Sequence, residues 1–401
     1  MNLISQKVSF TQISPNLAVY EGAGYACNDG LKMYRIRYEE LKDDIYDRFR
    51  IGLSDDNGKT WAEVHHWEAG ELVEGGVRRR LFLQSGIVMP KQDLLVMMGM
   101  EGVLRSDHPL DGMTHYYPIC MTSIDAGQTW NESRPIQEGK EFNEEHPFKS
   151  MWIGKNAIMP ANVPIVTRDG RLLVPCNVTT LGPDGEYFAP EGALTFTVAG
   201  VMIGTVGSGG RFDWHYGKAV HIPPEQSLRG AVEPALAEMQ DGRILMVLRA
   251  NDGTVEKQGG RKWFSISHDG GRTWSPPGRW TYSDGTSFYS PSSISILLWH
   301  TSGDLYWFGN ICLEQPKGNG PRYPLVVGRV NPDSLLLEKE SVFTIDTRKE
   351  GDSESLQLSN FCVYEDRPTG NLILHMTRWD GKPSGGVEAT EASVHLYRIE
   401  I

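Results

Sequence analysis

Arginine side chains from distant parts of this chain could together bind a carboxylate. Guanidinium groups stay charged at any working pH and hold a carboxylate through two parallel hydrogen bonds. Arg35, Arg249 and Arg322 lie in three well-separated segments. The formal net charge of the chain is −12, and three cations gathered at one point would be costly without an anion to balance them. Such a site requires a fold that arranges the three segments around one axis.

An eight-residue pattern, Ser-x-Asp-x-Gly-x-Thr-Trp, occurs three times in the chain. The copies span residues 54–61, 123–130 and 267–274, and residues 207–214 keep the glycine and tryptophan spacing of a worn fourth copy. Asp and Gly form turns, because the carboxylate accepts bonds from nearby backbone N–H groups and Gly adopts positive φ. Thr and Trp favour a strand. Each copy therefore predicts a hairpin turn between two strands.

A second repeat consists of a polar turn followed by a short apolar strand. Its turn residues are Asp93, Asp169, Asp241, Gly303 and Gly370. The intervals between them are 76, 72, 62 and 67 residues, and a period near 70 with several short strands suits a four-stranded propeller blade. With the opening segment 34–36, the repeat predicts six units.

These patterns predict an all-β fold, namely a six-bladed β-propeller with four-stranded antiparallel blades. We interpret residues 1–401 as a single domain in which the two ends of the chain complete a shared blade. Residues 394–399 are the predicted closing strand, and the only helical signal is one turn at 38–44.

The composition excludes several classes of partner. The acidic charge disfavours nucleic acid and anionic membrane surfaces, and no apolar run is long enough to span a membrane. The N-terminus lacks the form of a signal peptide, so we expect a cytoplasmic protein, or a secreted or periplasmic one whose signal has been removed. The five scattered cysteines show no metal-binding spacing, and we expect free thiols, no metal and no cofactor.

The octapeptide repeats resemble the Asp-boxes, or BNR repeats, of the sialidase (neuraminidase)-like superfamily, and the resemblance covers essentially the whole chain. Residues 34–37 resemble the early Arg-Ile-Pro motif of that family, with Arg37 in the place of proline. Residues 233–249 are similar to the family segment that runs from a glutamate to the second arginine. The resemblance implies that Arg35, Arg249 and Arg322, with Arg37 beside the first, bind the carboxylate of an acidic glycan or oligosaccharide.

The resemblance also implies an acid/base pair. Glu233 is the family glutamate, which would orient or deprotonate a neighbouring group, or form an ion pair with one of the arginines. The acid/base aspartate of the family lies in the loop after the first arginine, where Asp43, Asp44 and Asp47 are the acids. These residues predict an exo-glycosidase that removes a terminal acidic sugar.

One position departs from the family pattern. Leu358 occupies the place of the nucleophilic tyrosine, so direct attack by water becomes an alternative mechanism. Tyr289 lies near another expected substrate loop. Two other functions stay open: a lyase acting on uronate-containing polysaccharides, with a base such as His115 or His146, and a propeller that binds a glycan without turnover.

Overall fold

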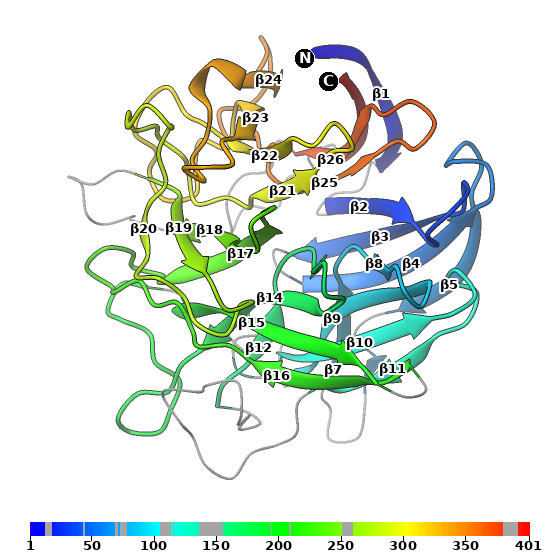
Figure 1. Cartoon of the computed structure of the whole chain (residues 1–401), viewed down its shortest axis with the longest axis horizontal. Coiled ribbons are helices and arrows are strands. Elements are labelled where there is room, and N and C mark those ends of the chain that lie inside the picture. Colours follow the sequence, from blue (N-terminus) through cyan, green and yellow to red (C-terminus); the bar gives the residue numbers. More distant parts are fainter. Residues whose placement is uncertain are drawn as a thin grey trace.

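The computed structural model shows six antiparallel sheets arranged as blades around a central axis, as the sequence predicts (Figure 1). The structure describes the chain except residues 13–17, 43–44, 69–70, 73–77, 105–113, 115, 136–154, 194, 208–209, 251–259 and 380–391.

The blades follow the order of the chain. Blade 1 consists of β2 (Ala18–Tyr25), β3 (Met33–Lys42), β4 (Ile45–Ser54) and β5 (Ala62–Glu68). Blade 2 consists of β6 (Glu71–Leu72), β7 (Arg78–Leu83), β8 (Ile87–Met89), β9 (Leu94–Leu104), β10 (Tyr116–Ser123) and β11 (Asn131–Ser133). Blade 3 consists of β12 (Ile158–Pro160), β13 (Ile165–Val166), β14 (Leu172–Thr179), β15 (Thr197–Val206) and β16 (Phe212–Tyr216).

The second half repeats the arrangement. Blade 4 consists of β17 (Ala231–Glu238), β18 (Ile244–Ala250), β19 (Trp263–Ser267) and β20 (Gly278–Arg279). Blade 5 consists of β21 (Ile296–Trp299), β22 (Leu305–Asn310), β23 (Leu325–Val330) and β24 (Phe343–Asp346), with a 3₁₀ helix at Lys339–Ser341. Blade 6 consists of β25 (Phe361–Glu365), β26 (Leu372–Trp379), β27 (Ala392–Glu400) and β1 (Asn2–Gln12).

The two ends of the chain close the ring in blade 6. Strand β1 pairs antiparallel with β27, from Asn2 opposite Glu400 to Gln12 opposite Ala392, and the N- and C-termini lie close together in Figure 1. The predicted closing strand at 394–399 is therefore confirmed within β27. This pairing completes blade 6 as a four-stranded sheet and joins the first strand of the chain to the last.

The predicted helical turn at 38–44 is wrong as far as residue 42, because β3 continues to Lys42 and pairs with β4. Tyr38 stacks on Phe82 of blade 2 at 4.8 Å between ring centroids. Packing between blades thus overrides the local helical preference of the Glu-Glu-Leu-Lys run.

The hydrophobic core lies between neighbouring blades. One cluster joins Val96 and Met98 of blade 2 to Val174 and Met202 of blade 3, and another joins blades 3 and 4. Every residue of β18 is buried. Each turn of the turn-and-strand repeat is followed by a strand that we call the second strand of its blade; the six are β3, β9, β14, β18, β22 and β26. Because a blade is covered on both faces, this strand is an apolar run rather than an alternating one.

The three octapeptides form the same turn between the last two strands of their blades. In the first copy the Ser54 hydroxyl accepts the Gly58 N–H at 2.9 Å, and the Asp56 carboxylate accepts both the N–H and the hydroxyl of Thr60 at 2.8 and 2.7 Å. The other copies repeat these bonds. The residues Asn57 and Gly58 both have positive φ, at 61° and 74°, as a tight hairpin turn requires.

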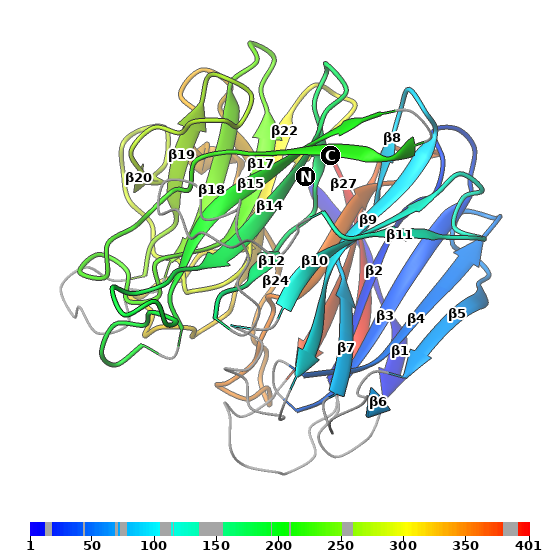
Figure 2. The same ribbon diagram turned by 90° about the horizontal axis from the view of Figure 1, so that it is seen from below.

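These turns define one end of the propeller, which we call the turn end. In blade 1, Ser54 of the turn pairs with Met33 at the start of β3, and in blade 4, Ser267 pairs with Ile244 at the start of β18. Seen at right angles to the first view, the four strands of blade 1 lie side by side (Figure 2). Second strands therefore run from the turn end to the opposite end, which we call the far end.

No helix among the described residues is long and apolar enough to cross a membrane. The worn fourth copy, residues 207–214, begins directly after β15, and its last three residues, 212–214, belong to β16.

We expect the Asp56→Ala variant to lower the melting temperature at pH 7 by about 1–3 °C, because it removes charge-assisted hydrogen bonds within the turn. Hydrogen bonds from the Thr60 N–H, the Thr60 hydroxyl and the Ser54 hydroxyl lower the pKa of Asp56 to about 2. This stabilisation is present above the ordinary pKa of 3.8 and is lost as the pH falls towards 2. Thermal unfolding at several pH values measures it.

The matched control is Asp55→Ala, which changes the adjacent aspartate, whose side chain is 88% exposed. Equal melting temperatures for the two variants would contradict the role assigned to Asp56.

Candidate functional site

Arg249 lies at the far end of β18, directly before its last residue. The apolar residues of β18 anchor the strand in the core, and the Arg249 side chain is only 10% exposed. Its Nε donates to the Ser292 hydroxyl at 2.9 Å, one terminal nitrogen donates to Glu233 at 2.7 Å, and the other reaches the Asn319 side-chain oxygen at 3.5 Å. These three partners hold the guanidinium in one orientation.

Glu233 lies in a β-bulge of β17, where the pairing with β18 skips from Val232 to Ala235. Its φ is 44°, a left-handed conformation that costs a non-glycine residue on the order of 1 kcal/mol or more. The Glu233 N–H donates to the Asn177 side-chain oxygen of blade 3 at 2.6 Å. The strained backbone is thus held by the bond to Asn177 of the preceding blade and by the ion pair between Glu233 and Arg249.

Arg322 reaches the same place from the segment before β23. Its Nε donates to the Asn319 carbonyl at 3.1 Å and one terminal nitrogen donates to the Gln357 side chain at 2.7 Å. Further bonds reach the Ser359 hydroxyl at 3.1 Å and the Ser292 carbonyl at 3.3 Å. These four acceptors are neutral, so they orient the guanidinium without cancelling its charge.

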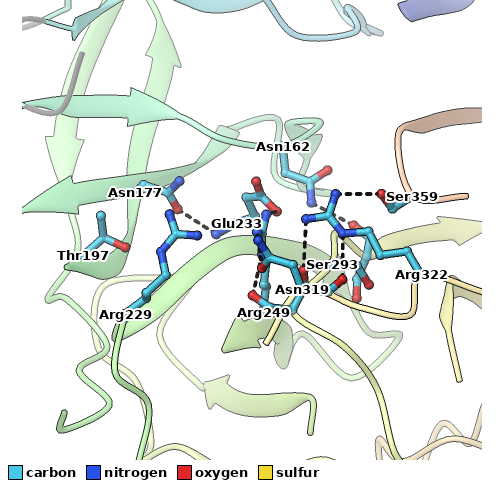
Figure 3. A network of polar contacts seen from close by, with 12 residues as sticks. Asn162, Asn177, Thr197, Arg229, Glu233, Arg249, Ser293, Asn319, Arg322 and Ser359 are labelled. Carbon is cyan, nitrogen blue, oxygen red and sulfur yellow. Dashed lines mark hydrogen bonds and ion pairs between the residues drawn. The ribbon is translucent and has the colours of Figure 1, made fainter. Parts of the chain in front are cut away.

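Glu233 is an ionised carboxylate among three arginines (Figure 3). Burial alone would raise its pKa, but Arg249, Arg322 and Arg229 outweigh burial and bring the pKa of Glu233 below its ordinary value. The Arg229 Nε is held by the Thr195 hydroxyl at 2.8 Å. The Glu233 side chain is 25% exposed, so solvent reaches the centre of the group. The arrangement is locally cationic in an acidic chain and can receive an anion.

The expected convergence of three arginines needs one correction, which concerns Arg35. Arg35 lies close to the turn end of β3, and its guanidinium carbon is 4.6 Å from the centroid of the Trp61 ring in the first octapeptide turn. Its Nε lies 3.8 Å from Glu21. Because β3 starts at the turn end, its third residue cannot lie level with Arg249, which is next to last in β18. The structure brings together Arg249 and Arg322 and places Arg35 elsewhere.

Arg37, rather than Arg35, occupies the position in blade 1 that Arg249 occupies in blade 4. Each is the seventh residue after a turn glycine, and each bonds at 2.7 Å to a glutamate sixteen residues earlier. The glutamate partner of Arg37 is Glu21, which also accepts a hydrogen bond from the Nδ1 of His375 at 2.8 Å. Burial raises the pKa of Glu21, but His375, Arg37 and Arg35 outweigh it and lower that pKa to about 2.

The two tyrosine positions considered from the sequence have different surroundings. Leu358, at the expected tyrosine position, is fully buried, and its N–H donates to the Arg322 carbonyl at 3.1 Å. The adjacent Ser359 supplies the hydroxyl at this place instead. The Tyr289 ring lies 4.0 Å from the guanidinium carbon of Arg261, and no described contact joins Tyr289 to Arg249 or Arg322.

Several predicted residues fall outside what the structure describes. Asp43 and Asp44 lie outside the described residues, and Asp47 lies in β4 with a side chain that is not described. His115 and His146 also lie outside the described residues. Among the described residues, no group of three or more histidine, cysteine or acidic side chains is placed to hold a metal ion.

Other residues of the site were not singled out from the sequence. They are Asn177, Arg229, Lys262, Ser292, Asn319 and Ser359. A signal existed for Asn177, which is the seventh residue after the turn glycine Gly170, as Arg249 is after Gly242. For the loop residues we find no comparable signal, because their positions depend on how neighbouring blades meet.

We expect Glu233→Gln to lower the free energy of unfolding at pH 7 by up to about 3 kcal/mol, because it leaves partly buried guanidinium groups without their carboxylate. The lowered pKa of Glu233 means that the wild-type advantage exists above the ordinary pKa of 4.5 and shrinks as the pH falls below it. Urea unfolding at pH 7 and pH 4 measures both quantities. The exposed Glu354 provides the control variant Glu354→Gln, and a loss as large in that variant would refute the specific role of Glu233.

Comparison with known proteins supports the fold described above. Among solved structures, a protein of unknown function from Dyadobacter fermentans is 12% identical with a TM-score of 0.61, over 100% of this chain and 99% of that one. The Trypanosoma rangeli sialidase is 14% identical with a TM-score of 0.58, over 96% of this chain and 55% of that one. The intramolecular trans-sialidase of Ruminococcus gnavus is 12% identical with a TM-score of 0.59, over 98% of this chain and 95% of that one.

These TM-scores show a shared fold, and this chain spans about half the length of the Trypanosoma enzyme. No curated protein matches the chain. The model of the BNR repeat-like domain family matches residues 87–354. The resemblance to the sialidase-like superfamily is thereby confirmed, and the chain belongs to the BNR repeat-like domain family.

Proposed function

We propose that this protein is a glycoside hydrolase of sialidase-like type that removes a terminal acidic sugar from a glycan. The observation that carries the proposal is the group of three guanidiniums, those of Arg229, Arg249 and Arg322, around the carboxylate of Glu233. One solved structure of similar fold is the Trypanosoma rangeli sialidase in complex with sialic acid, at 15% identity and a TM-score of 0.56. A carboxylate-bearing sugar would supply an anion for these cationic side chains.

The arginines would bind the sugar carboxylate. Neutral side-chain and backbone oxygens orient Arg249 and Arg322, and Arg249 also bonds to the Glu233 carboxylate. An arriving carboxylate therefore meets oriented donors and loses little to their reorganisation. Arg37 forms its own ion pair with Glu21 in blade 1. We therefore assign carboxylate binding to Arg249, Arg322 and Arg229.

Glu233 would act as a base. It is ionised because the arginines lower its pKa, so it cannot donate a proton to the leaving group. An anion bound by the arginines cancels part of their field, which raises the pKa of Glu233 towards the range in which a carboxylate accepts protons well. Leu358 has no hydroxyl that Glu233 could activate. The nucleophile is therefore a water molecule, which gives a proton to Glu233 and attacks the sugar directly. The acid would come from Asp43, Asp44 or Asp47.

Binding without turnover is the second candidate function. It is favoured by the buried Leu358 at the tyrosine position. It is also favoured by the ion pair between Glu233 and Arg249 at 2.7 Å, because a carboxylate engaged in this way is less able to accept a proton. In this case the arginine group would serve recognition only.

The two functions are separated by turnover of a panel of sialosides and uronosides, read both by released sugar and by ultraviolet absorbance. Released acidic sugar supports the proposal. Growth of ultraviolet absorbance, which reports an unsaturated product, would move the protein to the lyases. Affinity for acidic sugars without any product would establish binding alone.

On the substrate that the panel identifies, we expect Arg322→Met to lower kcat/KM by about 100-fold or more, because one oriented charge-assisted contact to the carboxylate is lost. The methyl ester of the same substrate, which has no negative charge, should lose far less activity in this variant. Arg35→Met is the matched control, since it removes an arginine at the turn end. Equal losses for Arg35→Met and Arg322→Met would contradict the assignment of the site.

A further inference from the structure

Lys262 is a fully buried lysine beside the arginine group. It directly precedes β19 in blade 4, and its side chain has no exposure to solvent. The Nζ group donates to the backbone carbonyl of Ser293. Among the described residues, no carboxylate lies within ion-pair distance of this nitrogen. A buried ammonium with one neutral acceptor is costly, so its surroundings require an explanation.

Three cationic side chains meet on one short segment of chain. Arg249 donates to the Ser292 hydroxyl, Arg322 donates to the Ser292 carbonyl, and Lys262 donates to the Ser293 carbonyl. Among the residues that the structure describes, the buried Ser293 hydroxyl has no hydrogen-bond partner. Figure 3 places Ser293 within the same group as Glu233 and Arg249. Residues 292–293 therefore contact both Lys262 and the two arginines, which places the Lys262 ammonium next to the anion site.

The proton of Lys262 is weakly held in this environment. Burial lowers the pKa of Lys262 most, Arg249 lowers it further, Glu233 raises it, Arg322 lowers it and Cys312 raises it, with a result of about 7. The arginines repel the ammonium at short range in a medium of low polarity. A lysine in this state gains or loses its charge in response to one further charge nearby.

We propose that Lys262 is the switchable cation of the anion site, and that a carboxylate bound at Arg249 and Arg322 draws one proton from solvent onto the Lys262 amine. The attraction between the bound anion and the ammonium stabilises the charged form, so binding and protonation favour each other. The inference rests on the proposed function only for the identity of the anion. The arginines supply the permanent charge of the site, and Lys262 supplies charge when a ligand is present.

The pH dependence of binding follows with a definite sign. Below about pH 7 Lys262 already carries its proton, so affinity for an anion does not change with pH. Above pH 7 affinity falls, by at most about tenfold per pH unit for one proton taken up, until the pH passes the raised pKa of the complex. The other charged groups that face Lys262 do not titrate in this range: the arginines stay charged, the pKa of Glu233 is lowered, and burial raises the pKa of Cys312 to about 12.

The test is an NMR titration of protein labelled with ¹³C at lysine Cε. Lys262→Met removes one signal and so identifies it. We expect a midpoint near pH 7 in the free protein, a higher midpoint in Arg322→Met, which removes a neighbouring cation, and a lower one in Glu233→Gln, which removes the neighbouring anion. Saturating N-acetylneuraminic acid or glucuronic acid should raise the wild-type midpoint by about one pH unit or more. Calorimetry in buffers of different ionisation enthalpy should show proton uptake that disappears in Lys262→Met.

Each outcome bears on the inference. A Lys262 midpoint at the ordinary value for lysine, or one near 7 that Arg322→Met does not move, would overturn it. Binding of either acid without a change in the midpoint would also overturn it and would leave the proposed function standing. If neither acid binds but both charge variants shift the midpoint as expected, the coupling of Lys262 to the arginines stands and the proposed function fails for these sugars.

Discussion

The bond from the second strand of one blade to the start of the next is the interaction on which the rest of this structure depends. It is made by the seventh residue after the turn glycine in four consecutive blades. The pairs are Asn177 with the Glu233 N–H, Arg249 with the Ser292 hydroxyl, Asn310 with the Leu358 carbonyl, and Thr377 with the Val19 carbonyl. Since apolar packing between blades is not directional, these polar bonds set how the blades align at the far end.

The candidate site is built from the same ring of bonds. Where blades 3, 5 and 6 carry a neutral Asn or Thr at this position, blade 4 carries Arg249, and the glutamate that faces it sits in a left-handed bulge. One bond therefore aligns two blades and also orients a cation. Blade 1 repeats the arrangement with Arg37 and Glu21, but there the glutamate is buried and also paired with His375. An ion pair at this position is thus structural in one blade and partly open to solvent in another.

The parts of the fold that local patterns encode were predictable. All six second strands lie where the turn-and-strand repeat and the segment 34–36 place them, because a strand buried on both faces must be a short apolar run after a turn. The sequence also proposed Arg249 and Glu233 as site candidates, and the structure places these two side chains in contact. Arg35 was misplaced since the motif does not reveal which end of β3 faces the site. Lys262 and Arg229 went unnoticed, because nothing in their local sequence shows that one becomes fully buried and the other lies beside Glu233.

The sequence by itself determined the turns and the number of blades, because these depend on residue types within about ten positions of one another and on a repeat that recurs along the chain. Only the tertiary structure decided which charges meet. Whether a cation lies at the turn end or the far end, and whether it is paired with a carboxylate, depends on strand direction and register across blades. Electrostatic interactions act through space between residues such as Arg249 and Arg322, which the chain separates and the propeller brings together.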